Sequence, residues 1–386
     1  MSNRHRTTLI SFLAYFIMSG MLAPIGIISG PMAEFFDLPV TEITARFSWL
    51  TMGIFVGAVL ALFVFQWFRI KHLFLLLYTL IALSLLGLLV VGGLTYVELS
   101  LGLVGICCGI GLPAAALVIS RSYAAEHRAS MLVITDGFFS VAGIICAWVA
   151  VWFVAQSMHW AWTYVLVAAV AACILVLAYT SRFPEQEEFA AGDAAPSTWP
   201  PSAWLCIAAL CTYTLAQNTI LWWLPQYAQN VLGAAPEPAG QLVSQFWSGM
   251  FAAQLFVAWW VFKIGVQRLL WLGCVCTCMF SIPLWILRDI DALLVLATVW
   301  GFANLGLLKV VLSYATQFTS VASGRLVSGL LLGATTGTAI APWISSHIVA
   351  AGDVTWALRF GSAGYLVMIG LVAAALLTSR GAQATS

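Results

Sequence analysis

Polar residues in this chain are confined to short interruptions between long apolar runs. A helix rises about 1.5 Å per residue, so it needs roughly 20 apolar residues to cross about 30 Å of hydrocarbon. Twelve runs are long enough, and they lie near residues 9–31, 45–67, 72–93, 97–119, 130–155, 160–180, 202–224, 243–262, 267–287, 292–315, 326–349 and 355–378. The pattern predicts an all-α membrane protein with twelve transmembrane helices.

The longest polar interruption follows the sixth run. It reads RFPEQEEFAAGDAAPSTWPPS and holds four acids and four prolines. Such a segment is typical of a solvated linker. We therefore interpret residues 182–201 as a cytoplasmic linker, residues 1–181 as an N-terminal six-helix lobe, and residues 202–386 as a C-terminal six-helix lobe.

The two predicted lobes also show weak internal similarity. A shift of 196 places Gly105 on Gly301, and a shift of 195 places Trp148 on Trp343. Nearly constant offsets of half the chain indicate a parallel duplication, as in two-lobed transporters.

Composition excludes several classes of protein. The chain is 62% hydrophobic and only 8% charged, whereas a soluble domain is about 25% charged. The first apolar run is preceded by a basic segment, as in a signal peptide, but no small-residue cleavage site interrupts it, so we expect a retained helix. The net charge of +1 argues neither for nor against nucleic acid as a partner, but no basic residues are clustered enough to follow its phosphates.

Motifs for other chemistry are missing from the sequence. It has no P-loop for ATP and no clustered His, Asp and Glu for an enzyme. Its nine cysteines all fall in predicted spans, where cysteine usually behaves as a small hydrophobe. We therefore expect no cofactor, no metal and no enzymatic activity.

Basic residues predict the orientation, because they accumulate on the cytoplasmic side. If the N-terminus is inside, three basic residues lie outside, Arg46, Arg288 and Arg359, and Lys309 lies within a span. The other eleven lie inside, at Arg4, Arg6, Arg69, Lys71, Arg121, Arg128, Arg182, Lys263, Arg268, Arg325 and Arg380. Both termini are therefore expected in the cytoplasm.

Local strings make a resemblance specific. Six plus six helices with an inner linker resemble the major facilitator superfamily. The strings EFFDLPV at 34–40, VITDGFFSVAG at 133–143, WLPQYA at 223–228 and QLVSQFW at 241–247 resemble its TsgA-like subgroup, which is related to fucose permeases. The resemblance implies a multi-pass transporter of the inner membrane that alternates access by rocking one lobe against the other, most simply as a monomer in the lipid bilayer.

The chain also departs from that family's patterns. Fucose permeases use carboxylates in helices 1 and 4, but the runs at 9–31 and 97–119 carry none in their central parts. This departure argues against sugar transport by that mechanism. From Asp136 and Lys309, two charges deep inside predicted spans, we expect proton-coupled symport of a small solute, with an organic anion as the substrate class. A sugar or nucleoside permease, an efflux antiporter and a non-transporting sensor remain the alternatives.

Two charges lie deep inside predicted spans, away from the span ends. At about 1.5 Å per residue, Asp136 lies roughly 10 Å from the cytoplasmic side and Lys309 roughly 25 Å from the outer side, so both lie in one layer. Charges inside the membrane mark functional sites by default. We expect an Asp136–Lys309 gate, with Asp136 taking up a proton when the lysine moves away. The alternatives are a snorkelling Lys309 and an Asp136 bonded to local backbone or to Arg128.

Neutral polar residues add candidates for the pathway. The resemblance places Tyr15, Gln217, Asn218 and Asn304 along the central cavity, where amides can bond substrate or join one helix to another. The weaker candidates are Trp49, Gln245, Trp247 and Gln254.

The candidates for the gate and the lobe interface are basic residues and glycines: Arg121, Arg128, Arg325, Gly53, Gly57, Gly329, Gly333 and Gly337. The glycines are spaced by four residues, which places each set on one helix face and lets backbones approach closely. In the family that this chain resembles, helices 2 and 11 meet across the lobe boundary, so a smooth glycine face would suit rocking. Static packing is the alternative.

Overall fold

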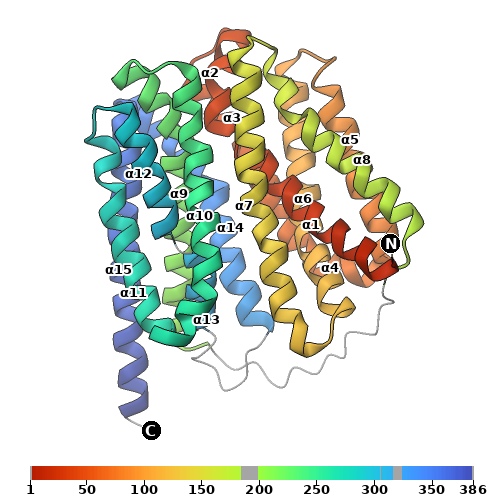
Figure 1. Cartoon of the computed structure of the whole chain (residues 1–386), viewed down its shortest axis with the longest axis vertical. Coiled ribbons are helices and arrows are strands. Elements are labelled where there is room, and N and C mark those ends of the chain that lie inside the picture. The colour runs from red at the N-terminus through yellow and green to blue at the C-terminus, as the bar shows by residue number, and fades with distance from the viewer. Residues whose placement is uncertain (1, 184–198, 305, 316–323, 385–386) are drawn as a thin grey trace.

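The structure is a computed structural model that describes residues 2–183, 199–304, 306–315 and 324–384. In this part of the chain all regular elements are helices. Figure 1 shows them as a bundle of long, steeply inclined helices. The predicted all-α fold is confirmed.

The N-terminal half, residues 1–181, contains α1 to α8 and a short 3₁₀ helix, η1. Their bounds are Asn3–Leu22 (α1), Ile25–Phe36 (α2), Val40–Arg46 (α3), Ser48–Trp67 (α4), Ile70–Gly87 (α5), Leu94–Ser122 (α6), Ala125–Ala155 (α7), Trp160–Tyr164 (η1) and Val165–Thr180 (α8).

The C-terminal half, residues 202–386, is covered by α9 to α15 and a second 3₁₀ helix, η2. Their bounds are Pro201–Leu232 (α9), Pro236–Ile264 (α10), Val266–Ser281 (α11), Pro283–Trp285 (η2), Ile290–Ala303 (α12), Leu307–Ala315 (α13), Gly324–Ala351 (α14) and Val354–Ala384 (α15).

Ten helical segments among the described residues are long and apolar enough to cross a membrane, or up to eleven if the bent pair α1 and α2 is one span. These two helices meet at 49°. The predicted span at 243–262 lies in α10, where Gln245, Ser248 and Gln254 lower the apolar character of the helix. The number twelve therefore stays a prediction.

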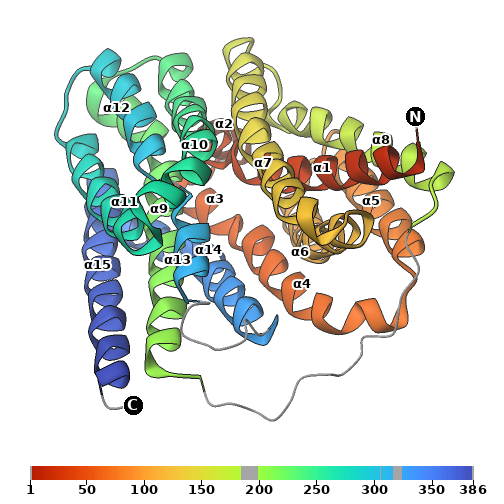
Figure 2. The ribbon, with the colours of Figure 1, turned by 60° about the horizontal axis from the view of Figure 1, so that its bottom comes forward.

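Most helix packing lies within each half of the chain. In the N-terminal half α4 packs on α6, α1 on α7 and α5 on α8, and in the C-terminal half α9 packs on both α14 and α15 and α10 on α12. Across the halves, α7 packs on α10, α4 and α3 on α14, and α2 on α9. Figure 2 shows α4 and α14 approaching each other between the two groups of helices.

One close contact occurs once in each half. A Cβ on Gly53 of α4 would lie 2.4 Å from the Gly102 oxygen of α6, and a Cβ on Gly249 of α10 would lie 1.9 Å from the Thr298 oxygen of α12. The same shift of 196 that places Gly105 on Gly301 places Gly53 on Gly249. The repeated contact supports an internal duplication.

The five glycines predicted at the lobe interface pack elsewhere, which corrects that expectation. Gly53 and Gly57 face α6 of their own half, and Gly333 and Gly337 face Ile207 and Cys211 of α9. Gly329 faces Ile207 of α9 and Trp199, which lies just before the start of α9. Spacing by four places glycines on one helix face but does not specify the neighbouring helix, and here that neighbour is always in the same half.

The halves are joined near the end of the bundle that is opposite to the linker, which we call the distal end. The linker end is marked by Asn3, whose side chain donates to the Arg182 oxygen at 2.7 Å. Toward the distal end, the Thr51 hydroxyl donates to the Ala339 oxygen at 3.0 Å, which joins α4 to α14. A Cβ on Gly26 would lie 2.4 Å from the Trp222 backbone oxygen. The halves are thus in contact at the distal end in this state.

Candidate functional site

An ion pair joins the two halves on the linker side of the bundle. The Lys309 ammonium of α13 contacts the Asp136 carboxylate of α7. The two side chains are 34% and 29% exposed, respectively, so the pair is neither sealed in the core nor fully open. Because the ammonium points to α7, Lys309 does not snorkel to an interface in this state.

A break in the helix positions Lys309. The sequence predicts a span at 292–315, and the structure has a candidate span at Ile290–Ala315, which is built from α12 and α13 with a break between them. Gly306 has φ +60°, a conformation that glycine adopts at little cost. The helix then restarts, with the Lys309 N–H donating to the Gly306 oxygen at 2.8 Å.

Asn304 stabilises this break and is fully buried. Its side-chain amide donates to the Trp300 oxygen at 2.8 Å, and its backbone oxygen accepts from the Leu307 N–H at 2.6 Å. The hydroxyl of Thr277 donates to the oxygen of Ala303, the last residue of α12, at 2.9 Å. The side-chain NH2 group of Asn304 therefore bonds the end of α12. The side-chain oxygen is buried without a hydrogen-bond partner, so the predicted hydrogen bond to substrate would have to use that oxygen.

The other pathway candidates, Asn218, Gln217 and Tyr15, have different surroundings in the structure. The Asn218 amide of α9 donates to the Thr338 hydroxyl of α14 at 3.1 Å, so it joins two helices of one half. Gln217 is buried on α9. Tyr15 is half-buried on α1 and lies within electrostatic range of Asp136. Among these candidates, the structure relates only Tyr15 directly to the ion pair.

The three arginines that the sequence suggests for the gate are Arg121, Arg128 and Arg325. Arg121 is half-buried in the last turn of α6. The side chains of Arg128 and Arg325 lie outside the part of the chain that the structure describes. Their predicted roles at a gate stay predictions.

Gln254 is the third side chain at the ion pair. Its amide nitrogen lies 3.5 Å from the Asp136 Oδ2 atom, which also accepts from Lys309. Gln254 is in α10, which packs along α7. In the sequence it is only a weak candidate, because a single glutamine in an apolar run carries no charge. The sequence holds no stronger signal, because the packing of α10 on α7 is set by the arrangement of the helices.

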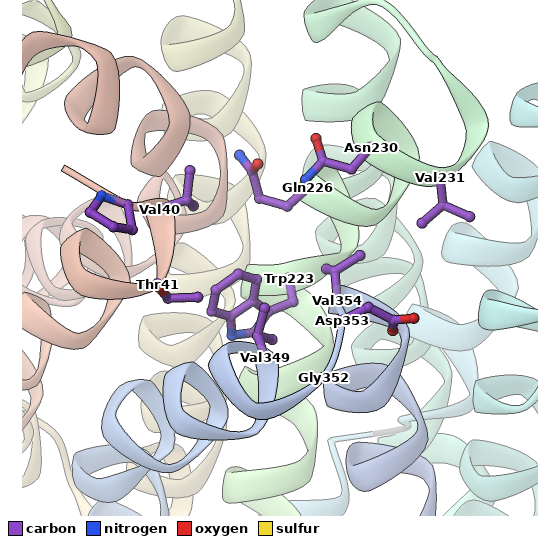
Figure 3. A pocket seen from close by; sticks show the side chains of 11 residues that line it. Val40, Thr41, Trp223, Gln226, Asn230, Val231, Val349, Gly352, Asp353 and Val354 are labelled. Carbon is purple, nitrogen blue, oxygen red and sulfur yellow. The ribbon is translucent and has the colours of Figure 1, made fainter. Parts of the chain in front are cut away.

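A pocket lies at the other end of the boundary. It has a volume of about 410 Å³ and is lined by Pro39, Val40, Thr41, Trp223, Gln226, Asn230, Val231, Val349, Gly352, Asp353 and Val354. Figure 3 shows Val40 and Thr41 of the N-terminal half facing side chains of α9 and of the α14–α15 connection. The pocket thus opens between the halves at the distal end, away from Asp136.

The described residues contain no group of three or more His, Cys, Asp or Glu that could hold a metal ion. Asp136 and Lys309 bring a carboxylate and an ammonium together inside the bundle, and charged groups in such a place mark a functional site by default.

Comparison with known proteins decides the family. A profile described as Major Facilitator Superfamily matches residues 7–320. The chain belongs to the Major Facilitator Superfamily. It is similar to "Protein TsgA homolog" of Edwardsiella ictaluri, with 29% identity over 95% of this chain and 94% of that one. It is 30% identical to the protein of the same name from Citrobacter koseri, again over 95% and 94% of the two chains.

Solved structures share the superfamily fold. One is a bacterial homologue of the human lysosomal transporter Spinster, in an inward-facing and unoccupied conformation, with a TM-score of 0.72 and 14% identity over 98% of each chain. A D-xylose-proton symporter has a TM-score of 0.75 and 12% identity over 96% of this chain and 97% of that one. The chain is therefore a multi-pass membrane protein of a transporter superfamily, as the TsgA-like strings predict.

Proposed function

We propose that this chain is a secondary active transporter that moves a small organic anion together with a proton across the inner membrane by alternating access. The observation that carries this proposal is the ion pair between Asp136 and Lys309, because each partner belongs to a different half of the chain. A contact of this kind must change when the halves move relative to each other. The same two groups are able to bind an anion and a proton.

Charge balance favours coupled loading of anion and proton. In the empty site, the carboxylate of Asp136 and the ammonium of Lys309 cancel. An anionic solute that takes the place of the carboxylate at Lys309 leaves Asp136 without its cation in a poorly hydrated region, where the neutral acid is favoured. The loaded site then holds a neutral acid, one ammonium and one anion. It is neutral in both forms, which limits the cost of carrying charge through hydrocarbon.

The conformation of the structure is consistent with the proposed state in which the site holds neither anion nor proton. The halves are in contact at the distal end through Gly26 and Trp222, while the ion pair joins them on the linker side. With the expected cytoplasmic termini, the distal end is the outer end. The Asp136–Lys309 ion pair thus coexists with a closed outer end. We assign the breaking of this pair to the step in which substrate enters the site.

Flux in proteoliposomes tests the proposal. A panel of labelled mono- and dicarboxylates is screened for uptake driven by an imposed pH gradient. Asp136→Asn is expected to abolish uphill accumulation while preserving solute exchange, because the neutral amide mimics the protonated acid. Lys309→Gln is expected to lose the anion, and Lys309→Arg to retain part of the binding.

The matched control is Arg46→Gln. It removes the partner of Glu42 and Glu98 near the distal end of the N-terminal half and leaves the central pair intact. Full accumulation by Asp136→Asn would remove this residue from the coupling. Uptake of neutral sugars or nucleosides that is indifferent to Lys309→Gln would favour a permease of another substrate class.

A further inference from the structure

Gln254 approaches the same carboxylate oxygen as Lys309. Its Nε2 atom donates to Asp136 Oδ2 at 3.5 Å, and the ammonium contacts that oxygen from α13. Both groups belong to the C-terminal half, whereas Asp136 belongs to the N-terminal half. Two donors therefore meet one acceptor atom.

The other end of the Gln254 amide has no hydrogen bond. Its Oε1 atom is buried without a hydrogen-bond partner. A side-chain amide carries a donor and an acceptor at nearly equal positions, and a half turn exchanges them. A buried acceptor without a donor is unfavourable, so a second use of this oxygen would explain the residue type.

Protonation of Asp136 would create the missing donor. A carboxylic acid needs an acceptor for its O–H, and an ammonium offers donors only, so Lys309 is unable to accept that O–H. Lys309 of α13 contacts Asp136, and Tyr15 of α1 lies within electrostatic range of it. The contribution of α10 is Gln254, which does not titrate.

We propose that Gln254 is a positioning residue that holds Asp136 in both protonation states, by donating from Nε2 to the carboxylate and, after a half turn of the amide, accepting at Oε1 from the acid. This inference rests on the proposed function, which requires Asp136 to take up a proton. The proton comes from water and forms one O–H bond on Asp136. Lys309 keeps its charge and is released to bind the anion. Gln254 thereby keeps the acid oriented while its cation is engaged elsewhere.

Infrared difference spectroscopy between high and low pH tests this inference on the full-length protein in lipid. The C=O stretch of protonated Asp136 is assigned as the band that Asp136→Asn removes. Gln254→Met keeps the length and unbranched shape of the side chain but offers no amide. We expect this band to shift to higher frequency in Gln254→Met, because the acid loses its hydrogen-bond partner. Gln254→Leu provides a second variant if Gln254→Met folds poorly.

The matched control is Gln245→Met in the same helix. The Gln245 side-chain oxygen accepts from the Thr298 hydroxyl at 2.9 Å within the C-terminal half, so its loss should leave the Asp136 band unmoved. A band that does not move in Gln254→Met or Gln254→Leu overturns the inference but leaves the proposed function standing. If the wild-type protein shows no band that Asp136→Asn removes, Asp136 does not become protonated, and the proposed function itself fails.

Discussion

Trp222 of α9 donates its indole N–H to the backbone oxygen of Leu22, the last residue of α1, at 3.2 Å. The bond crosses between the halves at the place where the first span bends into α2. Pro24 lies within that bend, directly before α2, where its missing N–H interrupts the helical hydrogen bonds. The Leu22 carbonyl, which the helix break leaves without its usual donor, thus accepts a hydrogen bond from a tryptophan of the other half. This hydrogen bond links the bend to the contact between the halves at the distal end.

Trp222→Phe should weaken this contact while keeping most of the ring packing. It leaves a buried carbonyl without a donor, which costs about 1–3 kcal/mol. We expect a cysteine placed at Thr41, beside the distal pocket, to react faster with a polar thiol reagent in this variant, after replacement of the native cysteines.

The neighbouring residue supplies the control for this prediction. The Trp223 indole donates to the Ser345 hydroxyl at 2.9 Å, a bond within the C-terminal half. Trp223→Phe should lower thermal stability without accelerating the reaction at Thr41→Cys. Equal acceleration in both variants would mean that the Trp222 bond does not hold the distal end closed.

Hydropathy predicts much of this fold because lipid imposes a simple condition on it. Every backbone group in hydrocarbon must be bonded internally, so an apolar run of sufficient length has to be helical. The twelve runs accordingly correspond to helices or to pairs of helices. Depth along the helices also placed Asp136 and Lys309 in one layer, and in the structure they form an ion pair.

Features set by side-chain contacts could not be predicted in the same way. The break at Gly306 lies inside an apolar run, and its free backbone groups are bonded by Asn304 and by the turn itself. Hydropathy does not register such a turn, although an Asn two residues before a Gly is a weak signal for one. The partner of a glycine face depends on helix arrangement, which spacing alone does not contain.

Gly53→Ala should lower thermal stability, because the new Cβ would lie 2.4 Å from the backbone oxygen of Gly102 and α4 would have to separate from α6. Gly370→Ala in α15 is the control, since nothing lies within 4 Å of its Cβ position and alanine favours a helix by up to about 1 kcal/mol. Thermal unfolding in detergent measures both. Equal unfolding temperatures for the two variants would contradict the close contact between α4 and α6.

His159 gives a pH-dependent prediction outside the spans. Burial lowers the pKa of His159 from its ordinary value of 6.5. Its Nδ1 atom accepts from the Ala161 N–H at 3.3 Å, and its ring contacts Phe35 edge to face at 4.6 Å. The unfolded chain therefore binds a proton more readily than the folded one. The stability from neutral His159 is present above about pH 6.5 and is lost as the pH falls below it.

Unfolding temperatures measured from pH 8 to pH 5 check this prediction. His159→Asn keeps an acceptor at the start of η1 but does not titrate, so part of the loss at low pH should disappear. His72→Asn on the exposed surface of α5 is the control and should leave the pH profile as in the wild type. An unchanged profile in His159→Asn would show that this ring is not responsible.

The last prediction concerns the ion pair itself and uses a charge swap. Asp136→Lys places two ammonium groups together, and Lys309→Asp places two carboxylates together, so each single variant should lower the unfolding temperature. The double variant restores opposite charges and should recover much of that loss, with a coupling of about 0.5–3 kcal/mol. It should still fail to accumulate solute, because the membrane-spanning part of α7, Ser130–Ala155, then has no carboxylate to carry the proton. As a control, Asp136→Lys combined with Arg46→Asp should give additive losses, because the ion pairs of the two sites involve different residues in the part of the chain that the structure describes. Additive losses in the charge swap as well would mean that Asp136 and Lys309 do not interact in the membrane, and the neutral-site argument for coupled transport would lose its basis.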